Sequence, residues 1–111
     1  MTETENIDVI LGKRLRFLRE QKNYTQKELA EKIGVVFQQI QKYETGVNRI
    51  SCCRLFQIMD ALDISIYEFF SGVRFNNQLL ISEEEGILLG AFRNTDEKFQ
   101  KAIMTLLAAE K

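Results

Sequence analysis

The sequence predicts an all-α fold, with a five-helix domain followed by a C-terminal extension of two helices. Its 111 residues contain no proline, the residue that most strongly disrupts a helix interior. Apolar residues recur at spacings of three and four, the period of a buried helical face. At three expected helix starts a serine or threonine is followed three positions later by glutamate, the pattern of a capping box: Thr25 with Glu28, Ser65 with Glu68, and Ser82 with Glu85.

Composition is that of an ordinary globular domain. Apolar residues make up 45% of the chain and charged residues 28%, which is enough for one domain or a small domain with a tail. No apolar run approaches the ~20 residues of a membrane span. The acidic, polar start MTETENID resembles neither a signal nor a transit peptide. These features lead us to expect a cytoplasmic protein.

The first two helices and their turn can be assigned from the N-terminal third. A first helix is expected over about residues 8–22, with Leu11, Leu15 and Leu18 buried, and residues 23–24 form the turn. The second helix begins at the cap Thr25, and its apolar residues 29, 30 and 33 have the spacing of a buried face. Gly34 can take the left-handed conformation that ends a helix, so a sharp turn follows.

The third helix is predicted to have one inward and one outward face. Val36, Ile40 and Tyr43 fall at i, i+4 and i+7, so they are expected to point toward the core. The opposite face has the polar residues Gln38, Gln41, Lys42 and Thr45, with Phe37 on the flank. Glutamine can pair with adenine, lysine with guanine or phosphate, and a phenyl ring with a thymine methyl. A simple solvated surface would also explain this face, but the preceding helix and turn favour DNA recognition.

Two further helices are expected to complete the domain. A fourth helix over about residues 52–62 has an apolar face, and Ser65 caps a short fifth helix that ends at Phe70. Cys52 and Cys53 follow Ser51, a candidate N-cap. We expect them to be small side chains, one packed and one near the surface. The alternative is a redox-sensing thiol, because a helix N-terminus can lower a thiol pKa.

The chain changes character beyond Gly72. Residues 72–81 have no helical period and are interpreted as an extended connector. Ser82 caps a helix that reaches about Arg93, and Thr95 is expected to cap the last helix. That helix has an apolar stripe that either folds back on the first domain or pairs with a second chain; the candidate dimerisation residues are Phe99, Ile103, Leu106 and Leu107. A stretch of about 40 residues buries its own core poorly, which favours a homodimer.

Residues 10–70 resemble the Cro and lambda-repressor-like helix-turn-helix family, often called Xre-type. The resemblance is carried by four segments at the family's spacings: LGKRLRFLRE, TQKELAEKIGV, IQKYETG and ISCCRLFQIMDALDISIYEFF. It implies a five-helix bundle over residues 7–71 with its third helix in the DNA major groove. Residues 72–81 would then be the connector, and 82–111 the extension, a probable dimerisation element.

The resemblance also implies roles for single residues. The base-reading positions would be Phe37, Gln38 and Lys42, with Gln41 beside them. The phosphate contacts would come from the start of the second helix and from the loop after the third: Gln26, Lys27, Thr45, Asn48 and Arg49. Arg19 and Glu44 would form a buried salt bridge that holds the scaffold. Position 36 is often serine or threonine in the family; Val36 here removes a side-chain cap, which costs about 1 kcal/mol.

The leading hypothesis is a dimeric transcriptional regulator, most simply a repressor, that reads a two-fold symmetric operator in double-stranded DNA. Net charge is −1, but residues 7–70 carry ten basic and eight acidic side chains, so the predicted DNA-binding part is the net-positive part. The alternative is a protein-partner adaptor or antitoxin-like module that uses the C-terminal helices. The sequence has no histidine and no phosphate-binding glycine loop, so we expect neither catalysis nor a metal, cofactor or small-molecule ligand.

Overall fold

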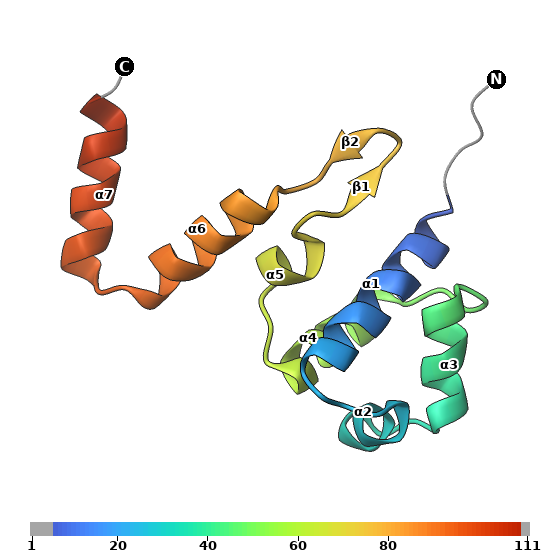
Figure 1. Ribbon diagram of the computed structural model, residues 1–111. Helices are drawn as coiled ribbons and strands as arrows, with labels where there is room; N and C mark the ends of the chain where they lie inside the picture. The colour runs from blue at the N-terminus through green and yellow to red at the C-terminus, as the bar shows by residue number, and fades with distance from the viewer. Residues whose placement is uncertain (1–5, 110–111) are drawn as a thin grey trace.

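A computed structural model describes residues 6–109. The acidic start at residues 1–5 and the last two residues of the predicted extension, 110–111, lie outside the described part. Figure 1 shows a helical bundle from which the C-terminal helices extend as an arm. Between residues 6 and 109, none of the helices combines the length and the apolar character that crossing a membrane requires.

Five helices form the bundle. They are α1 (Ile7–Gln21), α2 (Gln26–Ile33), α3 (Phe37–Thr45), α4 (Cys52–Leu62) and α5 (Ile66–Phe70). α1 crosses α3, and α2 packs against both α3 and α4. The predicted five-helix bundle is therefore present, and the predicted two-helix extension follows it as α6 (Glu83–Asn94) and α7 (Glu97–Ala109).

The core lies inside the five-helix bundle. Its fully buried large side chains are Leu15, Leu29, Ile40, Ile58, Leu62 and Phe69. The Phe69 ring meets the Phe70 ring edge to face, with centroids 5.1 Å apart, as expected for residues that close the core. Arg14 of α1 donates from Nε to the Phe69 carbonyl at 2.6 Å. This bond ties α1 to the C-terminus of α5, where a cation is favoured.

Gly12 sets the distance between α1 and α3. A Cβ at this position would lie 2.3 Å from the Tyr43 carbonyl oxygen and 2.8 Å from that of Glu44. Only a residue without a side chain lets the two backbones come this close. The crossing of α1 over α3 is therefore fixed by backbone contact as well as by side-chain packing.

The connector is a small antiparallel hairpin, which the all-helical prediction missed. Strand β1 (Arg74–Phe75) pairs with β2 (Gln78–Leu79) in the register Arg74 to Leu79. The turn residues Asn76 and Asn77 have φ of 50° and 64°, and asparagine tolerates this left-handed region well. The expectation of an extended connector was right, and the asparagine pair was the signal for the turn.

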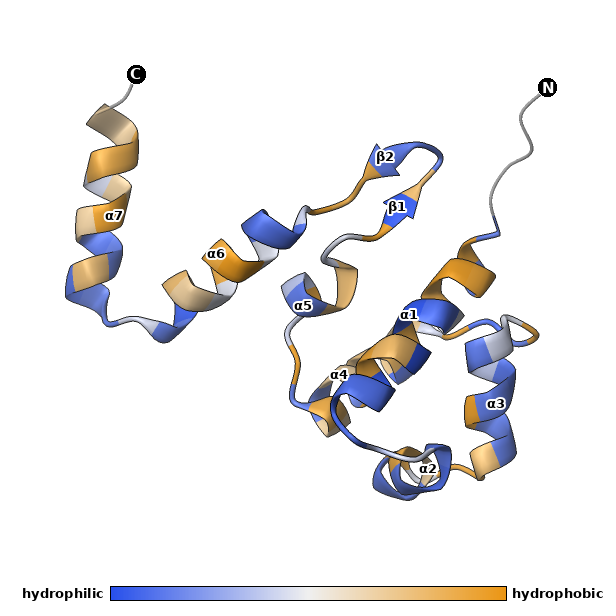
Figure 2. Ribbon diagram, in the orientation of Figure 1, coloured by the Kyte–Doolittle hydropathy of each residue, from blue (hydrophilic) through white to orange (hydrophobic). Residues whose placement is uncertain are grey.

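α6 leaves the bundle beside α5, and α7 extends beyond it. Gly86 lies against Ser71, where a Cβ would be 2.7 Å from Oγ. The Cα radius of gyration is 16.7 Å, against about 13 Å for a compact chain of this length. No residue of α7 is buried, so the alternative that the apolar stripe folds back on the bundle is wrong for this structure. Figure 2 shows the apolar segments of α6 and α7 along this arm.

The cap of α7 also differs from the prediction. Thr95 is the C-cap residue of α6. Asp96 caps α7 instead, because its Oδ1 accepts from the Phe99 N–H at 2.9 Å. Aspartate and threonine are both good N-caps, so the sequence alone did not separate two adjacent candidates.

Candidate nucleic-acid interface

The turn between α2 and α3 sets the direction in which α3 leaves the bundle. The Thr25 hydroxyl accepts from the Glu28 N–H at 3.0 Å, and the Glu28 carboxylate accepts from the Thr25 N–H at 2.9 Å. These bonds lower the pKa of Glu28 from its ordinary value, since the backbone and hydroxyl donors favour the carboxylate. Gly34 ends α2 with φ 74°, and a side chain here would strain the turn.

The start of α3 corrects one prediction. Val36 is the N-cap, its side chain is 67% exposed, and it makes no capping hydrogen bond. Val35 packs against the core in its place. The helical period placed Val36 inward, but that residue has extended backbone (φ −78°, ψ 151°). The inferred loss of a side-chain cap therefore agrees with the geometry.

The outer face of α3 presents the four predicted base-reading residues to solvent. Phe37 is 41% exposed, and Gln38, Gln41 and Lys42 are exposed as well. Within residues 6–109, the side chains of these two glutamines and this lysine make no hydrogen bond or ion pair with the protein. Their amide and ammonium groups are therefore available to an external partner.

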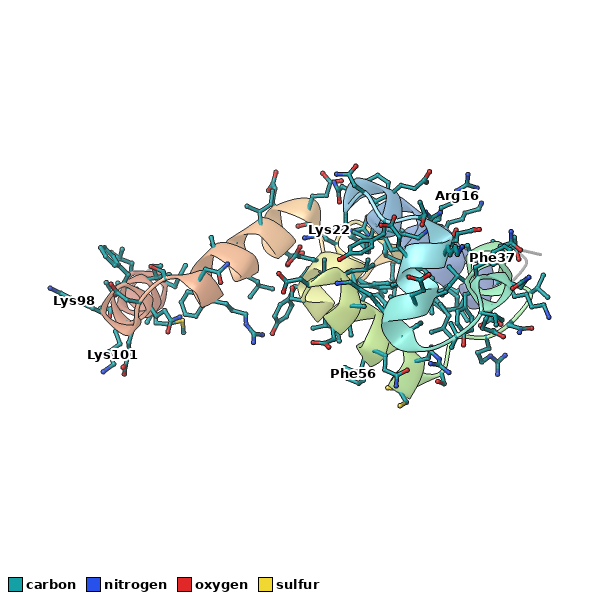
Figure 3. All side chains as sticks on the ribbon, turned by 90° about the horizontal axis from the view of Figure 1, so that it is seen from below. Arg16, Lys22, Phe37, Phe56, Lys98 and Lys101 are labelled. Atoms are coloured by element: carbon teal, nitrogen blue, oxygen red, sulfur yellow. The ribbon has the colours of Figure 1, made fainter. Side chains whose placement is uncertain are left out.

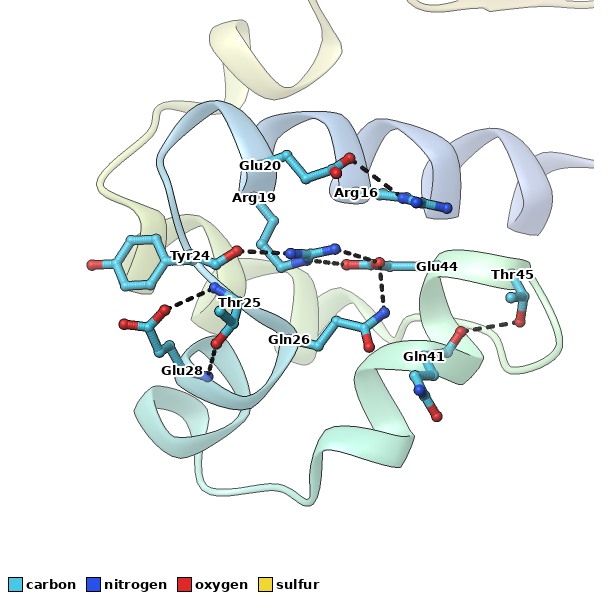
Figure 4. A network of polar contacts seen from close by, with 10 residues as sticks. All are labelled: Arg16, Arg19, Glu20, Tyr24, Thr25, Gln26, Glu28, Gln41, Glu44 and Thr45. Carbon is cyan, nitrogen blue, oxygen red and sulfur yellow. Dashed lines mark hydrogen bonds and ion pairs between the residues drawn. The ribbon is translucent and has the colours of Figure 1, made fainter.

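The inner face of α3 is held by a buried polar network. Arg19 Nε donates to Glu44 Oε2 at 2.6 Å, and its terminal nitrogen donates to Oε1 at 3.0 Å. The same arginine donates to the Tyr24 carbonyl at 2.7 Å. The hydrogen bond to Glu44 raises the pKa of Arg19 above its ordinary value. The network joins α1, the turn before α2, and α3, as Figure 4 shows.

Gln26 belongs to this network as well as to the predicted phosphate site. Its Nε2 donates to Glu44 Oε1 at 3.0 Å, and its side chain is half-buried. The first turn of α2 still presents the N–H groups of Gln26 and Lys27, which have no partner within the helix. Lys27 is exposed beside them. A helix start of this kind suits an anion.

The other predicted phosphate residues lie at the end of α3 and in the loop after it. Thr45 was predicted in the loop, but it is the last residue of α3. The Thr45 hydroxyl donates back to the Gln41 carbonyl at 3.0 Å, so it would have to rotate to donate to DNA. Asn48 is half-buried, and its backbone N–H donates to the Lys42 carbonyl at 3.2 Å. Arg49 lies 3.4 Å from Asp8, but its side chain is 81% exposed. It is the predicted phosphate ligand in this loop that extends furthest into solvent.

Sequence reasoning missed Arg16. A shallow hollow of 350 Å³ lies between α1, α2 and α3, lined by Arg16, Gln26, Gln41, Lys42, Glu44 and Thr45. Arg16 Nε lies 3.3 Å from Glu20 in an exposed pair, and Figure 3 shows it at the same end of the molecule as Phe37. The available signal was its position: Arg16 precedes Arg19 by three residues, one turn along the same side of α1.

The cysteines lie at the start of α4. Cys52 and Cys53 are both free and both exposed, so the expectation that one is packed was wrong. The Ser51 hydroxyl caps the helix by accepting from the Arg54 N–H at 3.1 Å, as predicted.

Comparisons with known proteins place this arrangement in a family. The family model described as helix-turn-helix matches residues 15–69. An uncharacterised HTH-type transcriptional regulator of Sinorhizobium fredii is 48% identical over 64 residues, which are 58% of this chain and 45% of that protein. The chain thus spans about half the length of this relative. The cryptic phage CTXphi transcriptional repressor RstR of Vibrio cholerae is 33% identical over 99 residues, covering 87% of this chain and 83% of the repressor.

Solved structures agree with the fold. The restriction-modification controller protein C.AhdI of Aeromonas hydrophila aligns with a TM-score of 0.56 and 32% identity, over 60% of this chain and all of that one. The clp gene regulator ClgR of Corynebacterium glutamicum aligns with a TM-score of 0.58 over 97% of both chains, at 21% identity. The second alignment extends the likeness of fold to α6 and α7. On the matched motif, the likeness to RstR over 83% of its length and the exposed outer face of α3, this chain belongs to the Xre-type helix-turn-helix family of DNA-binding proteins.

Proposed function

We propose that this protein is a sequence-specific transcriptional regulator that binds operator DNA as a homodimer. The observation that carries the proposal is the outer face of α3, where Gln38, Gln41 and Lys42 are exposed with no partner among the described residues. The Arg19–Glu44 pair fixes the opposite face of the same helix. A helix anchored on one side and unpaired on the other can enter the major groove without first breaking contacts.

Phosphate contacts would fix the register of α3 on the duplex. The candidates surround α3: the N-terminus of α2 with Lys27, Thr45 at the end of α3, the loop residues Asn48 and Arg49, and Arg16 at the edge of the hollow. Contacts of this kind position a protein on DNA and carry no sequence information. Each phosphate neutralised by a lysine or arginine adds to the salt dependence of binding. The charge balance of the chain predicts that only a few such phosphate contacts are made.

The C-terminal arm, α6 and α7, would supply the contact between the two chains of the dimer. We propose that residues 7–71 bind DNA, that 72–81 connect, and that residues 82–111 form the dimerisation element. Phe99, Leu106 and Leu107 of α7 are more than half exposed, and Ile103 continues their stripe. A two-fold dimer would set two recognition helices about 34 Å apart, one DNA turn, so the operator should be two-fold symmetric.

Repression is the simplest mode of action. A dimer seated on an operator blocks access to that DNA, and one full-length relative is named as a repressor. The adaptor or antitoxin alternative would require a tail that becomes ordered only on its partner. α6 has a complete capping box at Ser82 and Glu85, a local signal that forms the helix without a partner. This feature favours the DNA-binding regulator.

The test is selection of bound DNA from a random oligonucleotide pool at near-physiological salt. We expect enrichment of a two-fold symmetric motif. The Gln38→Ala variant should enrich a motif that is degenerate at one position in each half-site. Gln78→Ala, which removes an exposed amide from the distant hairpin, should enrich the wild-type motif. A folded protein that enriches no sequence would overturn the proposal, and an asymmetric motif would overturn its dimeric part.

A further inference from the structure

The apolar stripe of α7 is largely exposed, and only Ile103 within it is half-buried. Phe99 is 61% exposed and Leu106 69%, and no side chain of α7 is buried. Lys98 lies on one flank of this stripe, about 100° from Phe99 and 80° from Leu106 around the helix axis. Lys101 lies further round, about 160° from Phe99 and 140° from Leu106. α7 is therefore an amphipathic helix without a counterpart in its own chain among residues 6–109.

A groove of matching character lies at the other end of the arm. It runs between α1 and the first half of α6, has a volume of 480 Å³, and is lined by Arg14, Phe17, Leu18, Gln21, Glu68, Ser71, Glu83, Gly86, Ile87 and Gly90. Phe17 and Ile87 form its exposed apolar walls. Gly90 leaves part of the α6 wall open, since no described atom lies within 4 Å of where its Cβ would stand. A helix can approach closely at such a point.

The elbow between α6 and α7 keeps the two surfaces of one chain apart. Gln100 Nε2 donates to the Phe92 carbonyl at 2.8 Å and to the Thr95 carbonyl at 3.2 Å. Thr95 is extended, with ψ 163°. These bonds direct α7 away from the bundle, as Figure 1 shows. Within one chain, the stripe does not reach the groove.

We propose that the groove between α1 and α6 receives α7 of a second copy, and that two copies exchange their arms reciprocally. The inference rests on the proposed dimer and specifies its contact. Charge supports the pairing: the groove carries one basic side chain, Arg14, and two acidic ones, Glu68 and Glu83. Lys98 flanks the stripe that would enter it. A two-fold axis makes the contact twice, which helps a short helix approach the ~1,600 Å² of a stable interface.

The alternative dimer pairs the two α7 stripes with each other. It would leave the groove residues Phe17 and Ile87 exposed in each copy. The exchanged arrangement covers both apolar surfaces at once. The two arrangements also differ in which surfaces must be intact, and this difference can be tested by mixing variants.

The experiment uses one variant of each surface in the full chain. Gly90→Leu adds bulk to the groove at a position with free space in the monomer, and leucine favours a helix over glycine. Leu106→Glu places a charge in the stripe. The matched controls are Ala91→Leu, about 100° away from Gly90 around α6, and Thr105→Glu, off the stripe of α7. Dimer dissociation constants come from analytical ultracentrifugation, and heterodimers are identified by mass in native mass spectrometry.

We expect each surface variant alone to raise the dimer dissociation constant at least tenfold, while both controls stay near wild type. A mixture of Gly90→Leu with Leu106→Glu should form heterodimers. The unchanged α7 of the Gly90→Leu chain can enter the unchanged groove of the Leu106→Glu chain. If Gly90→Leu dimerises like wild type while Leu106→Glu is monomeric, the proposed homodimer is supported but the proposed exchange of arms is rejected. A mixture without heterodimers also rejects the exchange. A monomeric wild type rejects the dimer itself.

Discussion

The buried pair between Arg19 and Glu44 makes the sharpest prediction about the scaffold. The Arg19 and Glu44 side chains are 9% and 3% exposed, and Glu44 accepts three hydrogen bonds, two from Arg19 and one from Gln26. Glu44→Gln keeps the shape but removes the charge, and its amide N–H₂ would face the donors of Arg19. Breaking a buried pair by removing one partner costs about 3–5 kcal/mol.

We expect the lower end of that range, about 3 kcal/mol, because Arg19 keeps its bond to the Tyr24 carbonyl. In a domain of this size that loss lowers Tm by roughly 12–24 °C. Urea unfolding followed by circular dichroism measures it directly. Glu20→Gln is the matched control: it removes the same charge from the exposed pair with Arg16 and should cost about 0.5 kcal/mol or less. If Glu44→Gln cost under 1 kcal/mol, the network would not hold α3 as described.

The remaining predictions concern the interface and its capping residues. Gln38→Ala should cost roughly 1–3 kcal/mol on the operator and relax one base preference, whereas Arg49→Ala should weaken all sequences alike, as competition binding on a panel of operator variants will show. Arg16→Gln should lower the slope of log affinity against log salt by about one without changing base preference, which titrations at several salt concentrations measure. Val36→Thr should stabilise the fold by about 1 kcal/mol in urea, because it restores a cap at an exposed position. Glu28 has a lowered pKa in the folded state, so its contribution is present above the ordinary carboxyl pKa and is lost as pH falls through the folded value; Glu28→Gln should flatten the acid limb of a stability–pH curve.

The sequence predicted the elements whose signals are local. The capping boxes, Gly34 and the apolar spacing placed α1 to α6 within a residue or two, because a cap and a turn depend on a few neighbouring residues. The prediction that Val36 points inward was wrong for a related reason. The helical period was extended to Val36, one residue before the helix begins. The choice between Thr95 and Asp96 as the cap of α7 depended on backbone geometry that composition does not encode.

Features that depend on distant contacts were harder to predict. Arg16 lies beside Gln26 and Gln41 because α1 passes close to α2 and α3. Its spacing from Arg19 places it on the same side of α1 but does not report those contacts with other helices. The exposure of both Cys52 and Cys53 depends on how α4 lies in the bundle. For the candidate site, the outward face of α3 followed from its period, but the second role of Gln26 as a bond to Glu44 required the structure.

α3 contacts α1 at Gly12 with one side and presents the other side, which we propose contacts DNA, to solvent. The carbonyls of Tyr43 and Glu44 and the buried residues Ile40, Tyr43 and Glu44 belong to the bundle side. The outward residues, Gln38 and Gln41 among them, take no part in the contact with α1. Changes on the outer side can therefore accumulate without moving the helix axis. One rigid scaffold of this kind can serve many operators, and its DNA preference can diverge while its stability stays constant.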